Sequence, residues 1–582
     1  MDKIRKDQGL TSLCEEVFEP HLEGRMALQQ WKNALSKNPY ESLDDLRHSV
    51  QIYFPDDQDC LHQSLHQLGQ SLPRLEELAS ENDYRLNLPR LEAFDGIGQR
   101  IEKIIHHPVY DQCGDLIYGT SMMKMMSEPG GLLRSLCHFY LTSMAGEAGH
   151  NCPVACTAGI IRIFQKTPEF EGKSAYLAKL IEPRFSENFT GAQFLTEVQG
   201  GSDVGLNAVK AELEDGTWRI SGEKWFCSNA NADLILLTAR FGKQEEGTRG
   251  LGLFLVPKRL QSGELNRYTI RRLKEKLGTR SMASGEIDFR GAIAIPMGEV
   301  QEGFKLVMEN VLNLSRIYNT FTVMAMARRA YQISRFYAEN RVAFGRPIIN
   351  YPLVQESLAR VRSENSAIQA AAFHLTHLQD EMDLREIETE TEAREKLLLR
   401  FLTNSIKYIS SAWSVGHIRQ CIEILGGNGA IESFSTLPRL FRDSIVCENW
   451  EGTHNTLRAQ ILRDILKYHI HEPFFEHVNE SLSQCNQVEE IEIIRRLYEE
   501  CCTEIDNLKQ LDPIHQSLRI RHTLDRLCVL HLSTALVGEV RHELEKGNAS
   551  KLGCLRYFLL KNASEHCSGT GWSELDLIQT SA

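Results

Sequence analysis

The chain has 582 residues, too many for one ordinary domain and enough for about three or four. Apolar residues make up 42% and charged residues 25%, a composition typical of folded globular chains, which excludes extensive disorder. The 65 Lys and Arg against 78 Asp and Glu leave a net charge of −13, which argues against polyanion binding by the chain as a whole.

The cysteine pattern points to reduced thiols. Fifteen cysteines are scattered from Cys14 to Cys567 with no CxxC pair and no repeated spacing, so we expect neither a disulfide framework nor a metal site. No segment approaches the roughly 18 uninterrupted apolar residues of a membrane helix, and the charged first residues do not resemble a secretory signal. The sequence therefore predicts a cytoplasmic protein without a membrane span.

Three patterns of hydrophobic periodicity follow one another along the chain. Helical periodicity extends to about Pro183. Between about Gln193 and Gly298 the alternation shortens to that of strands, with a hairpin signal at Asp215-Gly216, which predicts a separate antiparallel β region. From Phe304 to about Ile470 the pattern is helical again and begins with more than 30 residues free of Pro and Gly, as expected in a helix bundle.

The last segment, 471–582, has an amphipathic signature of its own. Apolar residues recur there at steps of three and four, which places them on one helical face: Ile491, Ile494, Leu497, Cys501, Ile505 and Leu508. From Ile461 onward the chain carries 13 Lys and Arg against 19 Asp and Glu, a balance of −6. This tail is acidic.

Several short motifs carry possible chemistry. The segment 194–204 is a strand running into a glycine turn, where backbone N–H groups can approach an anionic or electron-rich ligand closely. Its spacing fits neither a dinucleotide fingerprint nor a P-loop. The other motifs are 222–229, 276–281, 341–347, 424–429, 437–443 and 449–455. Each motif alone is equally compatible with an ordinary turn or core strand.

In this order the motifs resemble those of the acyl-CoA dehydrogenase family over about residues 85–470. The resemblance is nearest to the AidB-like branch, through 147–153, 224–228 and 437–440. It implies a mainly α protein with a middle antiparallel β domain. The expected parts are an N-terminal helical extension (1–84), an N-terminal α domain (85–190), a middle β domain (191–300), a C-terminal four-helix bundle (301–470) and a helical C-terminal extension (471–582).

The resemblance also implies a mechanism. Members of the family use FAD to desaturate an acyl-CoA between its α and β carbons, and Glu451 matches their catalytic base. An unperturbed Glu, with a pKa of about 4.3, is a weak base, so burial beside Trp450 should raise its pKa. The backbone N–H of Glu451 would also stabilise the thioester oxygen. The alternative is an exposed Glu at a helix start, near the positive end of the helix dipole.

The cofactor contacts follow from the same resemblance. Leu195 and Thr196 match the strand along the pyrimidine edge of the flavin, and Gly201 and Ser202 match the turn beside the pyrophosphates of FAD and CoA. Phe226 packs on the ring in this reading and Ser228 faces its N5 atom. The remaining expected contacts are Arg341 and Phe344, toward the FAD of a neighbouring subunit, and Glu423, Gly427, Thr453 and Asn455, around the adenylate. Expected substrate contacts are Ser202, Trp450 and Gly452.

Three departures weaken the expected adenylate site more than the flavin-ring site. Val198 replaces the family's Pro, Glu423 stands where Gln is common, and His454-Asn455 replaces Ser-Gln. A Glu at position 423 would repel a phosphate. The planar guanidinium of Arg341 suits a pyrophosphate. Because the resemblance places this residue at the FAD of a neighbouring subunit, it implies a homodimer or homotetramer.

Three functions remain open at this stage. The first is an FAD-dependent acyl-CoA dehydrogenase that passes electrons to an acceptor. The second is a weakly catalytic or non-catalytic flavin-containing protein that binds acyl-CoA or fatty acyl groups. The third is AidB-like protection of DNA, which the acidic tail opposes because affinity for DNA depends on cations. Nucleic acid is therefore not an expected partner.

Overall fold

The computed structural model describes residues 19–385, 392–567 and 570–581. The interpretations of the chain's first residues and of Cys14 lie outside this part. The cysteines that it describes are all free. No helix within the described ranges is long and apolar enough to cross a membrane.

The N-terminal part is helical except for one hairpin. Its helices are α2 (Glu19–Leu35), α3 (Asp44–Tyr53), α4 (Gln58–Asn82), α5 (Pro108–Tyr118), α6 (Met122–Ser127), α7 (Leu132–Met144), α8 (Ala148–Lys166) and α9 (Lys173–Leu180). The hairpin pairs β1 (Arg90–Phe94) with β2 (Arg100–Ile105) and departs from the helical expectation. Its turn is stabilised by the Asp95 carboxylate, which accepts the N–H groups of Ile97 and Gln99. The sequence signal for this hairpin is the Asp95-Gly96 pair, which lies between two segments of alternating polar and apolar residues.

The middle part is a seven-stranded sheet in the order β3-β6-β4-β5-β9-β7, with β8 paired to β9. The strands are β3 (Gly191–Phe194), β4 (Lys210–Glu214), β5 (Thr217–Ser228), β6 (Leu234–Arg240), β7 (Leu251–Pro257), β8 (Tyr268–Leu273) and β9 (Ser284–Pro296). Pairing is mainly antiparallel, although β6 runs parallel to both β3 and β4. Because β7 pairs with both β6 and β9, the sheet curls into a barrel-like layer. The Asp215-Gly216 hairpin is confirmed, with positive φ at both residues.

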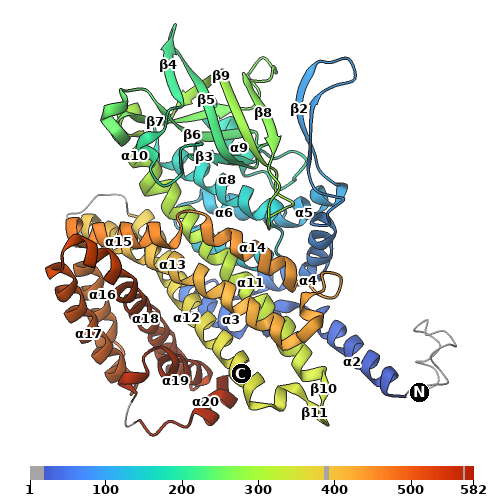
Figure 1. Cartoon of the computed structure of the whole chain (residues 1–582), viewed down its shortest axis with the longest axis vertical. Helices are drawn as coiled ribbons and strands as arrows, with labels where there is room; N and C mark the ends of the chain where they lie inside the picture. Colours follow the sequence, from blue (N-terminus) through green and yellow to red (C-terminus); the bar gives the residue numbers. More distant parts are fainter. Residues whose placement is uncertain (1–18, 386–391, 568–569, 582) are drawn as a thin grey trace.

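The bundle follows. It comprises α10 (Gly303–Leu306), a π-helical turn (Val307–Leu312), α11 (Asn313–Asn340), α12 (Pro352–Asp383), α13 (Glu392–Leu425), α14 (Leu437–Asn449) and α15 (His454–Tyr468). Helix α11, the predicted long helix, is buried over most of its length. A small hairpin, β10 (Val342–Ala343) with β11 (Arg346–Pro347), follows α11. Figure 1 shows the β domain at one end of the molecule and this hairpin at the other.

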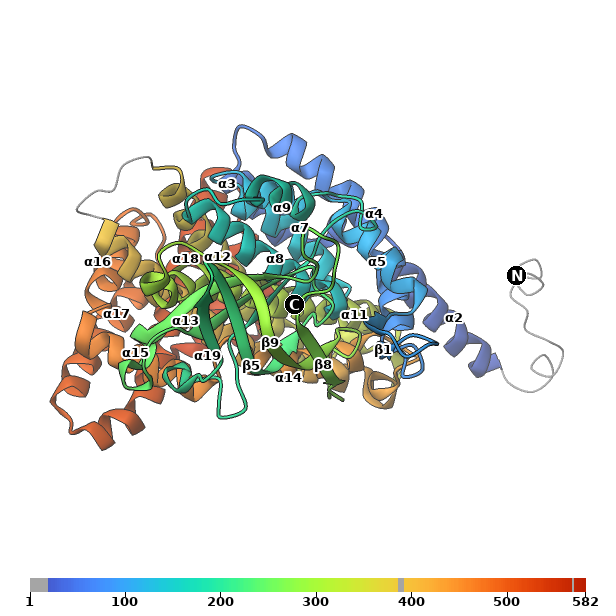
Figure 2. The ribbon, with the colours of Figure 1, turned by 90° about the horizontal axis from the view of Figure 1, so that it is seen from above.

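The C-terminal extension packs on the bundle rather than trailing from it. Its helices are α16 (His471–Ser483), α17 (Ile491–Gln510), α18 (Pro513–Glu545), α19 (Ser550–Asn562) and α20 (Glu574–Ser581). Helices α18, α19 and α20 contact α12, and the predicted apolar face of α17 is buried. Figure 2 shows this extension on one side of the molecule and α2 with α5 on the other.

The domain boundaries at 84, 190, 300 and 470 remain predictions. Helix α4, from the segment expected to be an extension, packs against α5 and α7 within one hydrophobic core. The β domain has a core of its own, which includes Phe194, Ile220 and Leu237. The mainly α fold with a middle β domain is confirmed.

Candidate active site at the junction of the β domain and the bundle

The backbone at Glu451 is unusual. Helix α14 ends at Asn449 and α15 begins at His454, and in the turn between them Glu451 has φ 57° and Gly452 has φ 107°. A left-handed conformation is strained for a residue with a side chain, and such residues concentrate at functional sites. Among the hydrogen bonds of the described residues, none uses the N–H of Glu451. This amide is therefore available to a ligand.

Two buried cations hold this turn in place. Arg316 on α11 donates from Nε to the carbonyl oxygen of Glu451 at 3.1 Å. Lys407 on α13 donates from Nζ to the carbonyl oxygens of Glu448, at 3.0 Å, and Gly452, at 2.7 Å. The strained turn is thus attached to two of the long helices of the bundle, α11 and α13.

The same cations set the electrostatics of Glu451. Burial raises the pKa of its carboxyl, the direction expected from the sequence, while Arg316 and Lys407 lower it in part. Burial lowers the pKa of Lys407 to about 8 and that of Arg316 to about 10. A partly desolvated carboxylate with a raised pKa is a stronger base than a free one.

The glycine turn of the β domain is supported by a buried ion pair. Lys224 on β5 donates to the Glu197 carboxylate at 2.7 Å, and both side chains are almost fully buried. Glu197 also accepts the N–H groups of Ala208 and Val209, so its charge is well satisfied. The Thr196 carbonyl accepts the N–H of Trp225 at 3.0 Å. Leu195 and Thr196 therefore lie directly beside the aromatic end of β5.

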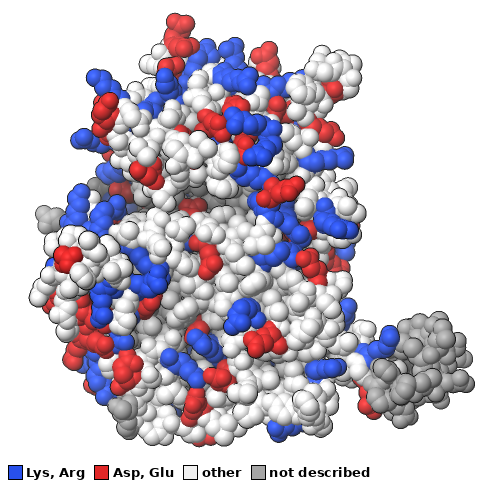
Figure 3. Space-filling model, in the orientation of Figure 1, with Lys and Arg blue, Asp and Glu red and all other residues white. Residues whose placement is uncertain are grey.

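The turn and the Glu451 segment meet. The hydroxyl oxygen of Ser202 lies 3.3 Å from that of Thr456, which in turn lies 3.0 Å from that of Thr453. Ser202 and the neighbouring Gly201 are exposed, and no atom lies within 4 Å of a Cβ built on Gly200. Asn455, on the first turn of α15, accepts a hydrogen bond from Arg458. Two motifs far apart in sequence thus form one open edge between the β domain and the bundle, where Figure 3 shows the surface hollowed.

An uncovered aromatic surface lies at the end of β5. The Phe226 side chain is 54% exposed, whereas Cys227 beside it is buried and Ser228 is partly buried. The Lys274 ammonium lies 3.5 Å from the centroid of Trp225 and 4.9 Å from that of Phe226. Exposed aromatic area of this kind can stack on a planar ring.

The remaining predicted contacts lie elsewhere. Arg341 follows the C-terminal end of α11, 25 residues after Arg316, which corresponds to about 37 Å along a helix. Phe344, in the β10–β11 hairpin, is 97% exposed. Glu423 and Gly427, at the end of α13, are also exposed, and nearby Asn428 donates to Tyr337 of α11 at 3.2 Å. Within one chain this group is not brought to Glu451.

Comparisons with known proteins agree with this architecture. The family "Acyl-CoA dehydrogenase, C-terminal domain" matches residues 301–466, the corresponding middle domain matches 192–292, and the "Adaptive response protein AidB N-terminal domain" matches 30–186. The putative acyl-CoA dehydrogenase AidB of Escherichia coli (strain K12) is 31% identical over 416 residues, 69% of this chain and 73% of that protein. The chain belongs to the acyl-CoA dehydrogenase family.

Other members of the acyl-CoA dehydrogenase family extend the comparison. Acyl-CoA dehydrogenase family member 11 of Caenorhabditis elegans is 31% identical over 65% of this chain, but the match spans only 62% of that protein. The crystal structure of Caenorhabditis elegans ACDH-11 in complex with C11-CoA has a TM-score of 0.81, 25% identity, and coverage of 90% of this chain and 91% of that one. Bacillus anthracis acyl-CoA dehydrogenase complexed with FAD, 18% identical, shares the fold at a TM-score of 0.65 over 97% of this chain and 93% of that one.

Sequence reasoning missed Arg316 and Lys407. Both are cations inside long, largely apolar helical segments, and that placement was the available signal, because a charge on a buried helix needs partners there. Both donate to backbone carbonyls at the Glu451 turn, and Arg316 donates also to the side chains of Asn404 and Gln460. No sequence pattern indicates these partners.

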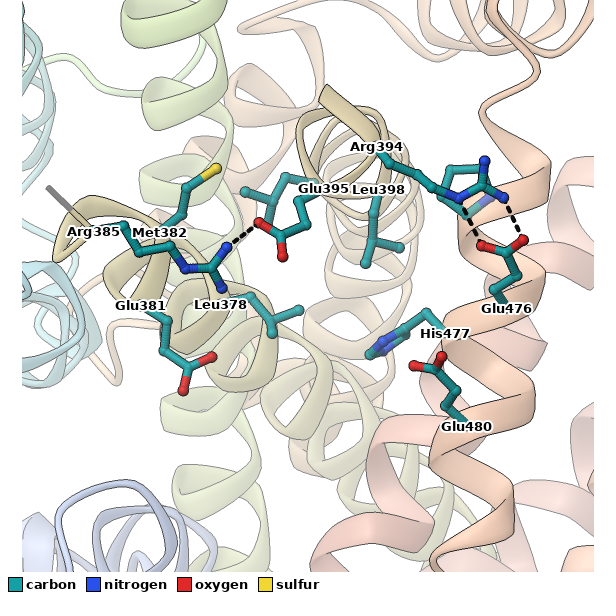
Figure 4. A pocket seen from close by; sticks show the side chains of 12 residues that line it. Leu378, Glu381, Met382, Arg385, Arg394, Glu395, Leu398, Glu476, His477 and Glu480 are labelled. Atoms are coloured by element: carbon teal, nitrogen blue, oxygen red, sulfur yellow. Dashed lines mark hydrogen bonds and ion pairs between the residues drawn. The ribbon is translucent and has the colours of Figure 1, made fainter. Parts of the chain in front are cut away.

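A cavity of about 260 Å³ lies between the C-terminal end of α12, the N-terminal end of α13 and helix α16 (Figure 4). Its floor is apolar, and its rim holds two ion pairs: Arg385 with Glu395, and Arg394 with Glu476. None of the predicted site residues lines it. Two further carboxylates, Glu381 and Glu480, line it outside these pairs, so the lining carries more acidic than basic side chains.

Proposed function

We propose that this acyl-CoA dehydrogenase-like oxidoreductase is an FAD-dependent enzyme that desaturates an acyl-CoA thioester between its α and β carbons. The observation that carries the proposal is the Glu451 turn: a carboxyl group with a raised pKa, beside a free backbone N–H, at the open edge where the β domain meets the bundle. Proton abstraction next to a thioester requires a base and an oxyanion donor at one place.

The residues present fit a flavin. Phe226 offers an exposed aromatic face and Ser228 a partly buried hydroxyl on the same strand. The space above Gly200 is open, and Gly201 packs so closely on Thr196 that no side chain fits there. Leu195 and Thr196 would lie along the ring edge, with Thr453 and Asn455 on the adenylate side. When bound, FAD accepts the β hydrogen as hydride.

The chain's own residues perform the other half of the reaction in this proposal. The Glu451 carboxylate takes the α proton, and its backbone N–H donates to the thioester oxygen, on which negative charge accumulates. Arg316 and Lys407 hold the turn so that both groups face one substrate. Ser202, Trp450 and Gly452 are the proposed substrate contacts.

A second copy of the chain completes the proposed cofactor site. Phe344 is almost fully exposed at the end of the molecule far from Glu451, as expected for a residue that meets another subunit. Arg341, Glu423 and Gly427 share that end. A homodimer or homotetramer, an electron-transfer acceptor and a cytoplasmic location remain predictions.

DNA is a weaker candidate for a partner. On the face seen in Figure 3, basic and acidic side chains are interspersed, also over the C-terminal extension. Salt-dependent DNA binding requires a concentration of cations.

The test is anaerobic titration of the flavin-loaded protein with acyl-CoAs of increasing length, followed by its visible spectrum. The wild type should bleach with at least one of them. Glu451→Gln should bind flavin but fail to bleach, whereas Glu448→Gln, the same change one turn earlier, should still bleach. Tight acyl-CoA binding without any bleaching would instead favour a binding protein.

A further inference from the structure

A small cavity lies just beyond the Glu451 turn. One wall is formed by Cys447 of α14 and by Trp450, the residue that follows this helix. Thr322 and Met326 of α11 form another wall. The remaining lining residues are Gly146, Ala148, Asn151, Thr279 and Asp443. Thr322 is six residues beyond Arg316 on α11, about 9 Å further along the helix. Trp450, the neighbour of Glu451 in sequence, lines the cavity, so under the proposed function we place the far end of an acyl chain there.

The cavity is small and partly polar. Its volume is about 10 Å³, the space of about one water molecule. The Oδ1 atom of Asn151 and the Oγ1 atom of Thr279 are buried and make no hydrogen bond to the described protein. These two side chains are only 4% and 1% exposed. Buried polar groups in folded proteins are normally paired, so an unpaired couple lining one cavity calls for a ligand group or water.

Hydrogen bonds fix the cavity walls. The carboxylate of Glu147, which caps α8, accepts hydrogen bonds from the N–H of Gly149 and the hydroxyl of Ser281. The N–H of Thr279 donates to the Asp443 carboxylate of α14 at 2.5 Å. Arg439, also on α14, donates to the carbonyl of Gly146 at 2.9 Å. Because α8, the 276–281 turn and α14 are joined in this way, the two free polar atoms are held in place before any ligand binds.

We propose that Asn151 and Thr279 form a specificity subsite for an acyl-CoA whose acyl group carries a hydroxyl at the end remote from the thioester. A hydroxyl can donate to the amide oxygen of Asn151 and accept from the hydroxyl of Thr279, whereas a methyl group can do neither. Placing a plain alkyl end there leaves both protein groups unsatisfied. The subsite therefore selects against unsubstituted chains that end at this depth.

The experiment is calorimetric titration of the flavin-loaded protein with matched pairs of acyl-CoAs. The pairs are butyryl-, hexanoyl- and octanoyl-CoA, each with its terminally hydroxylated counterpart. At one of the three lengths, the hydroxylated compound should bind at least about tenfold more tightly, which is about 1.4 kcal/mol. A preference of this size at none of the three lengths would overturn the inference and leave the cavity as the site of a structural water.

Variants locate the preference. Thr279→Val and Asn151→Leu should each reduce the ratio of the two affinities toward one. Thr279→Ser should keep the wild-type ratio, because it retains the hydroxyl. Thr523→Val is the matched control, since Thr523 is also buried with an unpaired hydroxyl but lies on α18. An unchanged ratio in Thr279→Val would contradict the assignment.

This inference rests on the proposed function for its placement of the acyl chain, yet the two can fail separately. Bleaching by unsubstituted acyl-CoAs, with an affinity ratio near one, would keep the dehydrogenase and remove the subsite. Selective binding of a hydroxylated acyl-CoA, with no bleaching by any compound, would keep the subsite and remove the dehydrogenase.

Discussion

Residue 451 combines two features that each cost stability. Its left-handed backbone is strained by about 1–3 kcal/mol, and its partly buried carboxylate is disfavoured relative to water. Lys407 offsets both, since it anchors the carbonyls on either side and supplies a nearby positive charge. We therefore regard Lys407 as a positioning residue that acts through Glu451.

Replacing Lys407 by Met should move the pH dependence of flavin reduction. Glu451 must be deprotonated to act as a base, so the rate falls as the pH drops through its pKa. Lys407 lowers that pKa, so its removal should raise the pKa further and shift the acid limb of the kcat/KM profile to higher pH. Lys467→Met, at an exposed site on α15, should leave the limb in place. A variant that is slower at every pH, with an unmoved limb, would show that Lys407 has only a structural role.

The β10–β11 hairpin is the element whose role a single chain leaves unexplained. It carries an almost fully exposed Phe344 with positive φ on a turn that ends far from Glu451. Exposed aromatic area on a projecting hairpin is characteristic of a surface that another chain covers. The proposed contact of Arg341 with FAD would likewise form only when a second chain covers this surface.

Phe344→Ala should weaken association and flavin binding while leaving the isolated fold intact. Nothing in the described chain packs on this ring closely enough to bury it, so the thermal midpoint of the monomer should change little. Loss of one interface anchor should weaken flavin retention by about tenfold. Analytical ultracentrifugation and flavin content would measure this, with Ile97→Ala, another exposed hairpin position, as the control. Unchanged oligomeric state and flavin content would remove the hairpin from the cofactor site.

At the scale of the whole molecule, a buried polar network joins the two ends of the chain. Asp45 of α3 pairs with Arg328 of α11 at 3.0 Å, and Lys551 of α19 pairs with Glu539 of α18 and lies 3.6 Å from Asp45. Burial alone would lower the pKa of Lys551, but Glu539 and Asp45 raise it above its usual 10.5. The C-terminal extension is thereby fastened to the N-terminal helices as well as to the bundle.

Lys551→Met should destabilise the protein by about 3–5 kcal/mol, because it leaves the buried Glu539 carboxylate without its cation, while Asp45 keeps Arg328. The pKa of Lys551 is raised on folding, so its contribution is present at neutral pH and disappears as the pH rises above about 10.5. Denaturation of the wild type and of Lys551→Met, with the exposed Lys546→Met as control, would measure it. An effect no larger than that of Lys546→Met would show that the network does not hold the extension.

The sequence by itself determined the succession of helices, strands and helices, the long α11, the amphipathic face of α17 and the motifs that indicate the family. These depend on periodicity and turn chemistry, which act over a few residues. The β1–β2 hairpin was missed because its strands are short and half-exposed.

Only the tertiary structure decided the environment of Glu451 and the polar end of the cavity beyond it. Arg316 lies 135 residues and Lys407 44 residues before Glu451, and Asn151 lies on α8 whereas Thr279 lies between β8 and β9. Burial and charge proximity depend on distance in space, which local patterns do not encode. Sequence therefore names the candidate base, and the fold sets its pKa, its free N–H and the neighbouring cavity in which two polar side chains lack a partner.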